Sequence, residues 1–282
     1  MSNISFLVDT KEDAAYRAGI RAWLEENLPK ELRGWSVRPP PEMTQPWHRK
    51  LHDRGLIAPH WPKEHGGTEA PLNERLILQE ELGRVGAPVL SRQALGHIGP
   101  ILMRHGTEEQ KSQHLHKMLT GEVLWCQGYS EPGAGSDLAS LSTRGVIDGD
   151  EIVINGQKIW TTWGHHANWM YALIRTDPDA PRKQAGISMV LIDMTTPGIT
   201  PRPIMTIAGD EEFSEVFFDD VRVPVANLVG DLNDGWRVAK ALLASERIGN
   251  ANPQLSLETL DRVRKVAKAT GMLDDPVFRD KL

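Results

Sequence analysis

The chain has 282 residues, of which 40% are hydrophobic and 25% are charged, a composition typical of a soluble globular protein with a sizeable core. Its formal net charge of -6 comes without a basic domain, which argues against nucleic acid as a partner. A single cysteine, Cys126, excludes an internal disulfide framework and suits a reducing compartment.

The N-terminal stretch resembles no targeting peptide. It lacks the apolar core of a secretory signal and carries acidic residues early, unlike an arginine-rich transit peptide. No apolar run reaches the length that a membrane span requires. We therefore expect a cytoplasmic protein without a membrane span.

Helical patterns fill residues 1–121, which we expect to form an N-terminal helical domain. Apolar residues over 11–27 recur at helical spacing, and Pro29 closes that segment. Thr107 and Gln110 have the spacing of a capping box at the start of a helix. The other expected segments are a proline-rich connector at 37–46, a helix ending near Arg54, and helices over 71–85, 91–105 and 107–119.

The pattern changes after Gly121 to short segments of alternating polarity, which predicts a central antiparallel β domain over 122–231. Asn155-Gly156, between EIVI and QKIW, is typical of a hairpin turn. Helical character returns over 232–282, the expected beginning of a C-terminal helical domain. This order gives an α+β protein without a βαβ rhythm. The expected strands are 123–129, 141–147, 151–154, 157–162, 169–175, 187–192 and 213–218.

The stretch GYSEPGAGSD at 128–137 carries the most specific pattern in the chain. A serine-hydrolase elbow would need glycine where Pro132 stands, and a dinucleotide-binding turn would need glycine at Leu138. Both interpretations are therefore disfavoured. A plain Pro-Gly turn would leave its polar residues unexplained, namely Ser130, Glu131, Ser136 and Asp137.

Together with GQKIWTT at 156–162, this stretch resembles the acyl-CoA dehydrogenase family. Only Tyr129 departs from the family pattern, where an aliphatic residue is usual. The resemblance implies a helical domain, a central β domain and a C-terminal helical domain, with FAD held between them. Further collinear matches are APHWPKEHGG (58–67), ERLILQEELGRVG (74–86), HGTEEQK (105–111), FFDDVRVPVANLVG (217–230) and GWRVAK (235–240).

The resemblance assigns most cofactor contacts to these two motifs. Trp160 would stack on the flavin, and a threonine after it would bond near N5; a core indole on an alternating strand is the alternative for Trp160. Ser136 would also touch the acyl-CoA. For Trp163, His165 and His166 we expect surface or packing roles. The complete implied FAD set is Gln127, Tyr129, Ser130, Gly135, Ser136, Trp160, Thr161 and Thr162.

Removal of an α-proton from a thioester needs a carboxylate in a dry pocket. Many family members carry it late in the C-terminal domain, but some carry it, followed by arginine, on the first long helix of that domain. ALLASERIGNA places Glu246 and Arg247 at that position, and Leu243 and Arg247 would then contact substrate. The alternative is that Glu246 and Arg247 form an exposed charged pair.

The C-terminal segment 268–282 lacks the Arg-x-x-Phe-Gly stretch of many family members. By this resemblance we expect a chain that is C-terminally short for the family and closer to the bacterial large-subunit type, similar to the pimeloyl-CoA and steroid side-chain enzymes. A homo- or hetero-oligomer partner chain would then complete the FAD site.

The function implied is FAD-dependent α,β-dehydrogenation of an acyl-CoA thioester to the trans-2-enoyl-CoA. Glu246 is the expected base, flavin N5 the hydride acceptor and an electron-transfer flavoprotein the electron acceptor. Two alternatives stay open: a non-catalytic or truncated subunit of a hetero-oligomer, and an acyl-CoA oxidase.

Overall fold

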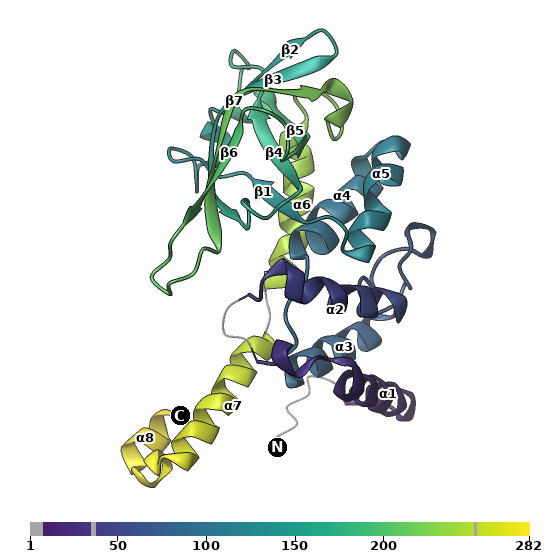
Figure 1. Ribbon diagram of the computed structural model, residues 1–282, viewed down its shortest axis with the longest axis vertical. Helices are drawn as coiled ribbons and strands as arrows, with labels where there is room; N and C mark the ends of the chain where they lie inside the picture. Colours follow the sequence, from purple (N-terminus) through teal and green to yellow (C-terminus); the bar gives the residue numbers. More distant parts are fainter. Residues whose placement is uncertain (1–7, 35–37, 251–252) are drawn as a thin grey trace.

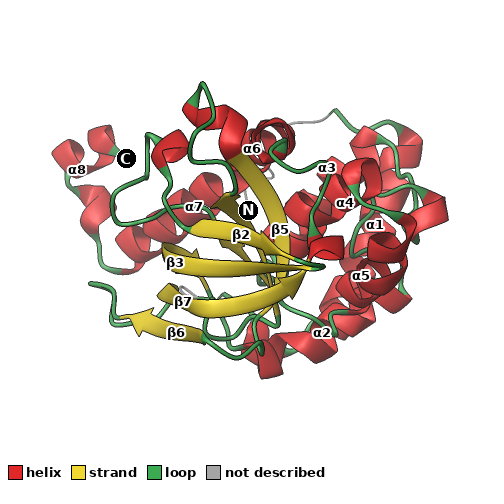
Figure 2. Ribbon diagram, turned by 90° about the horizontal axis from the view of Figure 1, so that it is seen from above, coloured by secondary structure: helices red, strands yellow, loops and turns green. Residues whose placement is uncertain are grey.

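A computed structural model describes residues 8–34, 38–250 and 253–282, without the side chains of 245–250, 253–255 and 257–258. N-terminal helices lie beside a curled sheet, and C-terminal helices follow it (Figures 1 and 2). The N-terminal helices are α1 (Lys11–Asn27), α2 (Pro41–Asp53), α3 (Leu72–Arg84), α4 (Gly99–His105) and α5 (Glu108–Thr120). The C-terminal helices are α6 (Gly235–Asn250), α7 (Pro253–Ala269) and α8 (Pro276–Lys281).

The N-terminal helices largely follow the sequence pattern. The capping box at Thr107 and Gln110 is present at the start of α5. The expected helix over 91–105 is divided into a π-helical segment, η3 (Gln93–Ile98), and α4.

The proline-rich connector expected at 37–46 is partly wrong, because α2 begins at Pro41 and contains Pro46. Proline suits the first position of a helix. Pro46 costs an intrahelical bond, but the fully buried Trp47 on the next position anchors this helix in the core.

The strands form one sheet with the order β1-β4-β2-β3-β7-β6, and β5 pairs with β4. Most pairs are antiparallel, as expected, but β1 and β2 both run parallel to β4. The sequence pattern gave no signal for β6. The strands are β1 (Trp125–Gly128), β2 (Arg144–Asp148), β3 (Glu151–Thr162), β4 (Trp169–Arg175), β5 (Ile187–Asp193), β6 (Ile199–Ile204) and β7 (Phe213–Pro224).

The hairpin turn expected at Asn155-Gly156 is wrong, because β3 continues through both residues. The turn lies before β3, where Gly149 has a φ of +66°. Gly156 instead sits at a register shift between β3 and β7 with a φ of +145°. A Cβ there would lie 2.7 Å from Thr143 Cα, so the close approach explains the glycine.

Each face of the sheet has a buried core, although much of β2 and β6 is exposed. On one face, Leu102 of α4, Met118 of α5 and Leu242 of α6 share a core with Tyr171 of β4. On the other face, strand residues pack on one another because the sheet curls. Strand β4 is therefore apolar at nearly every position rather than alternating.

Of the three C-terminal helices, only α6 packs extensively against the sheet. Helix α6 packs on β5 and η3, whereas α7 and α8 lead away from the body of the molecule in Figure 1. Several apolar side chains on this extension are exposed: Val263, Val266, Met272 and Val277. Within the described ranges, no helix is both long and apolar enough to cross a membrane.

Candidate active site

The loop that follows β1 is held by the neighbouring strand β3. Ile159 N donates a hydrogen bond to Ser130 O at 2.9 Å. The ring of Tyr129 is buried and meets Tyr171 edge-to-face at 5.9 Å between centroids. This brings the two sequence motifs side by side.

An ion pair beneath this loop links the motifs a second time. Lys158 is completely buried, and its Nζ lies 2.8 Å from Glu131 Oε1 and 3.2 Å from Tyr129 O. Glu131 also accepts hydrogen bonds from the backbone N–H groups of Ser142 and Thr143, at 2.6 and 2.9 Å. The lysine and these donors depress the pKa of Glu131 to about 2 despite its burial.

The pKa of Lys158 is lowered to about 8 by burial, against the attraction of Glu131. The attraction of Glu131 therefore helps this buried lysine to keep its charge. A simple Pro-Gly turn gave no reason for Glu131. The structure gives one, because the buried carboxylate of Glu131 joins the loop to Lys158 of β3.

The tip of the loop is open. Glu131 and Ala134 exchange backbone hydrogen bonds of 2.9 and 3.0 Å across the turn. A Cβ on Gly135 would meet nothing within 4 Å, and Ser136 is exposed. Asp137 bonds Lys183 at 3.1 Å and accepts from Ser140, so it secures the far end of the loop.

The end of β3 is bulged, which turns Trp160 outwards. Lys158 pairs with Val216 and Thr161 pairs with Ser214, leaving two residues opposite one. Trp160 has a φ of +60° and is 58% exposed. A core position for this indole is therefore wrong. Positive φ at a bulky residue is strained, and such strain clusters at functional sites.

Two buried polar atoms lie near this bulge without protein partners. Neither Gln127 Nε2 nor Thr161 Oγ1 has a hydrogen-bond partner among the residues described here. Thr161 is fully buried and Thr162 is half-buried. Buried polar atoms are normally paired, so these two are suited to a bound polar ligand.

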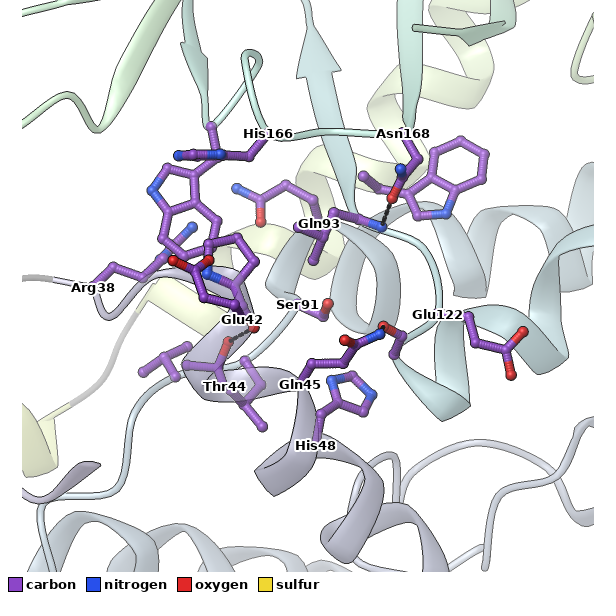
Figure 3. A pocket seen from close by; sticks show the side chains of 17 residues that line it. Arg38, Glu42, Thr44, Gln45, His48, Ser91, Gln93, Glu122, His166 and Asn168 are labelled. Atoms are coloured by element: carbon purple, nitrogen blue, oxygen red, sulfur yellow. Dashed lines mark hydrogen bonds between the residues drawn. The ribbon is translucent and has the colours of Figure 1, made fainter. Parts of the chain in front are cut away.

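A cavity of about 400 Å³ adjoins this region between α2, residues 89–93 and the loop 163–168 (Figure 3). Trp163, directly after Thr162, lines it. The Cζ atom of Arg38 lies 4.8 Å from the centroid of the Trp163 ring, a cation–π contact. His165 serves a packing role through Ser214 Oγ, 2.7 Å from its Nδ1, and His166 is exposed.

The position of the predicted base, the side chain of Glu246, is not described by the structure. Glu246 and Arg247 belong to α6, but their side chains lie outside the described residues. Leu243, one helical turn earlier, is half-buried and packs against the core between helices and sheet.

Family models match most of the chain. Residues 10–122 match the N-terminal domain of acyl-CoA dehydrogenases, and residues 126–221 match the middle domain. The chain is 39% identical over 281 residues to acyl-CoA dehydrogenase IpdE1 of Mycobacterium tuberculosis, covering 95% of this chain and 72% of the relative.

The chain belongs to the acyl-CoA dehydrogenase family.

Other acyl-CoA dehydrogenases support the same assignment. FadE34 of Mycobacterium tuberculosis is 46% identical over 264 residues, which are 92% of this chain and 34% of that protein. The solved structure of the Tcur3481-Tcur3483 steroid ACAD superposes with a TM-score of 0.84 at 35% identity, covering 97% of this chain and 71% of that chain.

Acyl-CoA dehydrogenases bind FAD, and the residues present here fit that cofactor. The flavin ring has several hydrogen-bonding atoms and a flat apolar face. The partnerless Gln127 Nε2 and Thr161 Oγ1 can pair with such atoms, and the exposed Trp160 can cover such a face. Sequence reasoning missed Lys158 and Arg38. The inward-facing lysine of GQKIW was a signal for the first, whereas no local pattern marked the second.

Proposed function

We propose that this acyl-CoA dehydrogenase catalyses the α,β-dehydrogenation of an acyl-CoA thioester to the trans-2-enoyl-CoA. The observation that carries the proposal is the exposed, strained Trp160 beside the open loop 129–137. When bound, FAD supplies the acceptor for the hydride that leaves the β-carbon.

Residues of the two motifs hold the cofactor in this proposal. Gln127, Ser130 and Thr161 pair its polar atoms, and Trp160 stacks on the ring with Thr162 near N5. Tyr129 contributes backbone groups beside the ring. Hydrogen-bonding all of these atoms is required once the ring is out of water.

The open tip of the loop faces phosphate and thioester groups. Gly135 allows their close approach, since a side chain there would occupy free space. Ser136 is exposed and can donate its hydroxyl to a phosphate or amide oxygen.

Glu246 is the proposed base that takes the α-proton, with Arg247 beside it and Leu243 against the acyl group. Helix α6 packs on β5 and η3, which favours this helix as the wall facing the cofactor. An electron-transfer flavoprotein in the cytoplasm is the proposed acceptor of the electrons from the reduced flavin.

A second candidate is that this chain works as one subunit of a hetero-oligomer. Solved relatives of this chain include the Tcur3481-Tcur3483 steroid ACAD and the ChsE4-ChsE5 complex from Mycobacterium tuberculosis, the latter at 33% identity and a TM-score of 0.73. The exposed apolar residues of α7 and α8 favour coverage by another chain; Val266 and Val277 are both 61% exposed. A pure chain that stays colourless with FAD, and takes up flavin only with a partner, supports this candidate.

Turnover by a Glu246→Gln variant tests the proposed function. The FAD-loaded full chain, with its partner if one is needed, is incubated with octanoyl-CoA and an artificial electron acceptor, and trans-2-enoyl-CoA is measured by mass spectrometry. The variant should lose at least about 100-fold in rate, because a positioned base contributes that much. Glu12→Gln on the distant helix α1 is the matched control. An unchanged rate in the Glu246 variant would contradict the base assignment.

A further inference from the structure

Arg38 lines the cavity of Figure 3, and it forms no ion pair with any side chain that the structure describes. Its guanidinium rests on the Trp163 ring, with Cζ 4.8 Å from the ring centroid. Among the side chains described, no carboxylate lies within 4 Å of it, and none accepts a hydrogen bond from it. Burial lowers the pKa of Arg38, and the nearby positive charge of Arg92 lowers it further, whereas the negative charge of Glu212 raises it. The guanidinium nevertheless stays protonated, because arginine is a very strong base. Arg38 is half-buried, and a charge that is largely withdrawn from water normally has a partner.

None of the described side chains that line the cavity forms an ion pair with Arg38. Glu42 and Glu122 line it, but both are exposed to solvent. His48 is neutral at ordinary pH, because burial lowers its pKa to about 4. In Figure 3 the residues of α2 lie on one side of the cavity, and His166 and Asn168 lie on the opposite side.

The cavity also lies next to the proposed reaction site. Trp163 follows directly on the segment Trp160–Thr162, and Gln93 opens the η3 segment that packs against α6 and β1. A volume of about 400 Å³ suits part of a ligand of ordinary size. An acyl group bound for dehydrogenation can therefore extend towards Arg38.

We propose that this cavity receives the end of the acyl group remote from the thioester, and that Arg38 there binds a free carboxylate. The preferred substrate is then an acyl-CoA that carries a second carboxyl group. Trp163 covers one face of the guanidinium and leaves its in-plane N–H donors for a bidentate contact, the geometry in which arginine binds carboxylates best. This inference rests on the proposed function for the direction of the acyl group.

Binding of two matched thioesters tests the proposal. Octanoyl-CoA and suberoyl-CoA have the same chain length and differ only in the terminal carboxylate. Calorimetry on the FAD-loaded full chain should show tighter binding of suberoyl-CoA. Arg38→Gln should raise the Kd for suberoyl-CoA by about tenfold to hundredfold, since a hydrogen-bonded charge is lost, and leave octanoyl-CoA nearly unchanged. Arg222→Gln, the same change on an exposed arginine of β7, should change neither Kd.

The controls separate three outcomes. Equal weakening of both thioesters by Arg38→Gln means that Arg38 only clamps its segment onto Trp163, and it overturns the proposal. No wild-type preference for suberoyl-CoA overturns it as well. Turnover is recorded in parallel: a preference lost in Arg38→Gln without any dehydrogenation supports the carboxylate site and refutes the proposed function instead. If the glutamine variant does not fold, Arg38→Lys, which keeps the charge but not the planar fork, should lose part of the preference.

Discussion

Lys158 shows how one residue can connect the loop after β1 to the sheet. It occupies an inward position of β3, where an alternating strand normally places an apolar side chain. Its three donors reach Glu131 and the carbonyl of Tyr129, which both belong to the loop. The ion pair between Lys158 and Glu131 therefore fixes the loop to the sheet, and with it the loop residues that we assign to FAD.

Removing one member of this pair should destabilise the protein strongly. Lys158→Met leaves Glu131 buried without its cation, and breaking a buried pair in this way costs about 3–5 kcal/mol. Chemical denaturation of the wild type and the variant measures the difference in the free energy of unfolding. Arg222→Gln, which breaks two exposed ion pairs, should leave that free energy nearly unchanged. Equal effects of the two substitutions would show that Lys158 and Glu131 contribute no special stability.

The same pair predicts a pH dependence. The pKa of Glu131 is about 2 in the folded chain against an ordinary value of 4.5, so the unfolded chain takes up the proton first as the pH falls. Its stabilising contribution is complete above pH 4.5 and is lost progressively towards pH 2. Denaturation midpoints across this range should fall less steeply for Glu131→Gln than for the wild type. Parallel curves would contradict the assigned pKa.

At the scale of elements, local signals were predictable from the sequence and pairings between distant segments were not. The capping box at Thr107 is confirmed because all its atoms lie within one helical turn. Asn155-Gly156 has the composition of a turn, but pairing with β7 on one side keeps β3 continuous. The burial of β4 on both faces likewise depends on the curl of the whole sheet, which no local pattern predicts.

The candidate site follows the same rule. The resemblance identified both motifs, yet the bulge that exposes Trp160 depends on its register with β7. Arg38 and Trp163 lie far apart in the sequence and meet only in the folded chain. The hydrophobic pattern within either segment therefore could not predict the contact between Arg38 and Trp163.

Gly156 offers a test of the sheet geometry. Gly156→Ala should lower the free energy of unfolding by about 1–3 kcal/mol, because a φ of +145° strains alanine and its Cβ would lie 2.7 Å from Thr143 Cα. Gly19→Ala, on the exposed face of α1 with nothing within 4 Å, should raise the free energy by about 0.5–1 kcal/mol instead. Thermal and chemical denaturation of both variants provide the measurement. A neutral Gly156 variant would contradict the close approach.

At the scale of the whole molecule, the sheet carries the proposed cofactor residues at the bulged end of β3 and in the loop after β1, and α6 carries the proposed base. Helix α6 shares its core with α4, α5 and β4, so it is fixed relative to the motif loop. The apolar residues of α7 and α8 remain exposed, and their coverage by a second chain is the natural expectation for an oligomer.

The central claim is that this arrangement removes hydrogen from an acyl-CoA. Anaerobic addition of octanoyl-CoA or suberoyl-CoA to the FAD-loaded chain, with its partner if one is needed, tests it most directly. The account predicts loss of the visible absorbance of oxidised flavin, together with an equal amount of trans-2-enoyl-CoA. Flavin that stays oxidised while the thioester binds would contradict it.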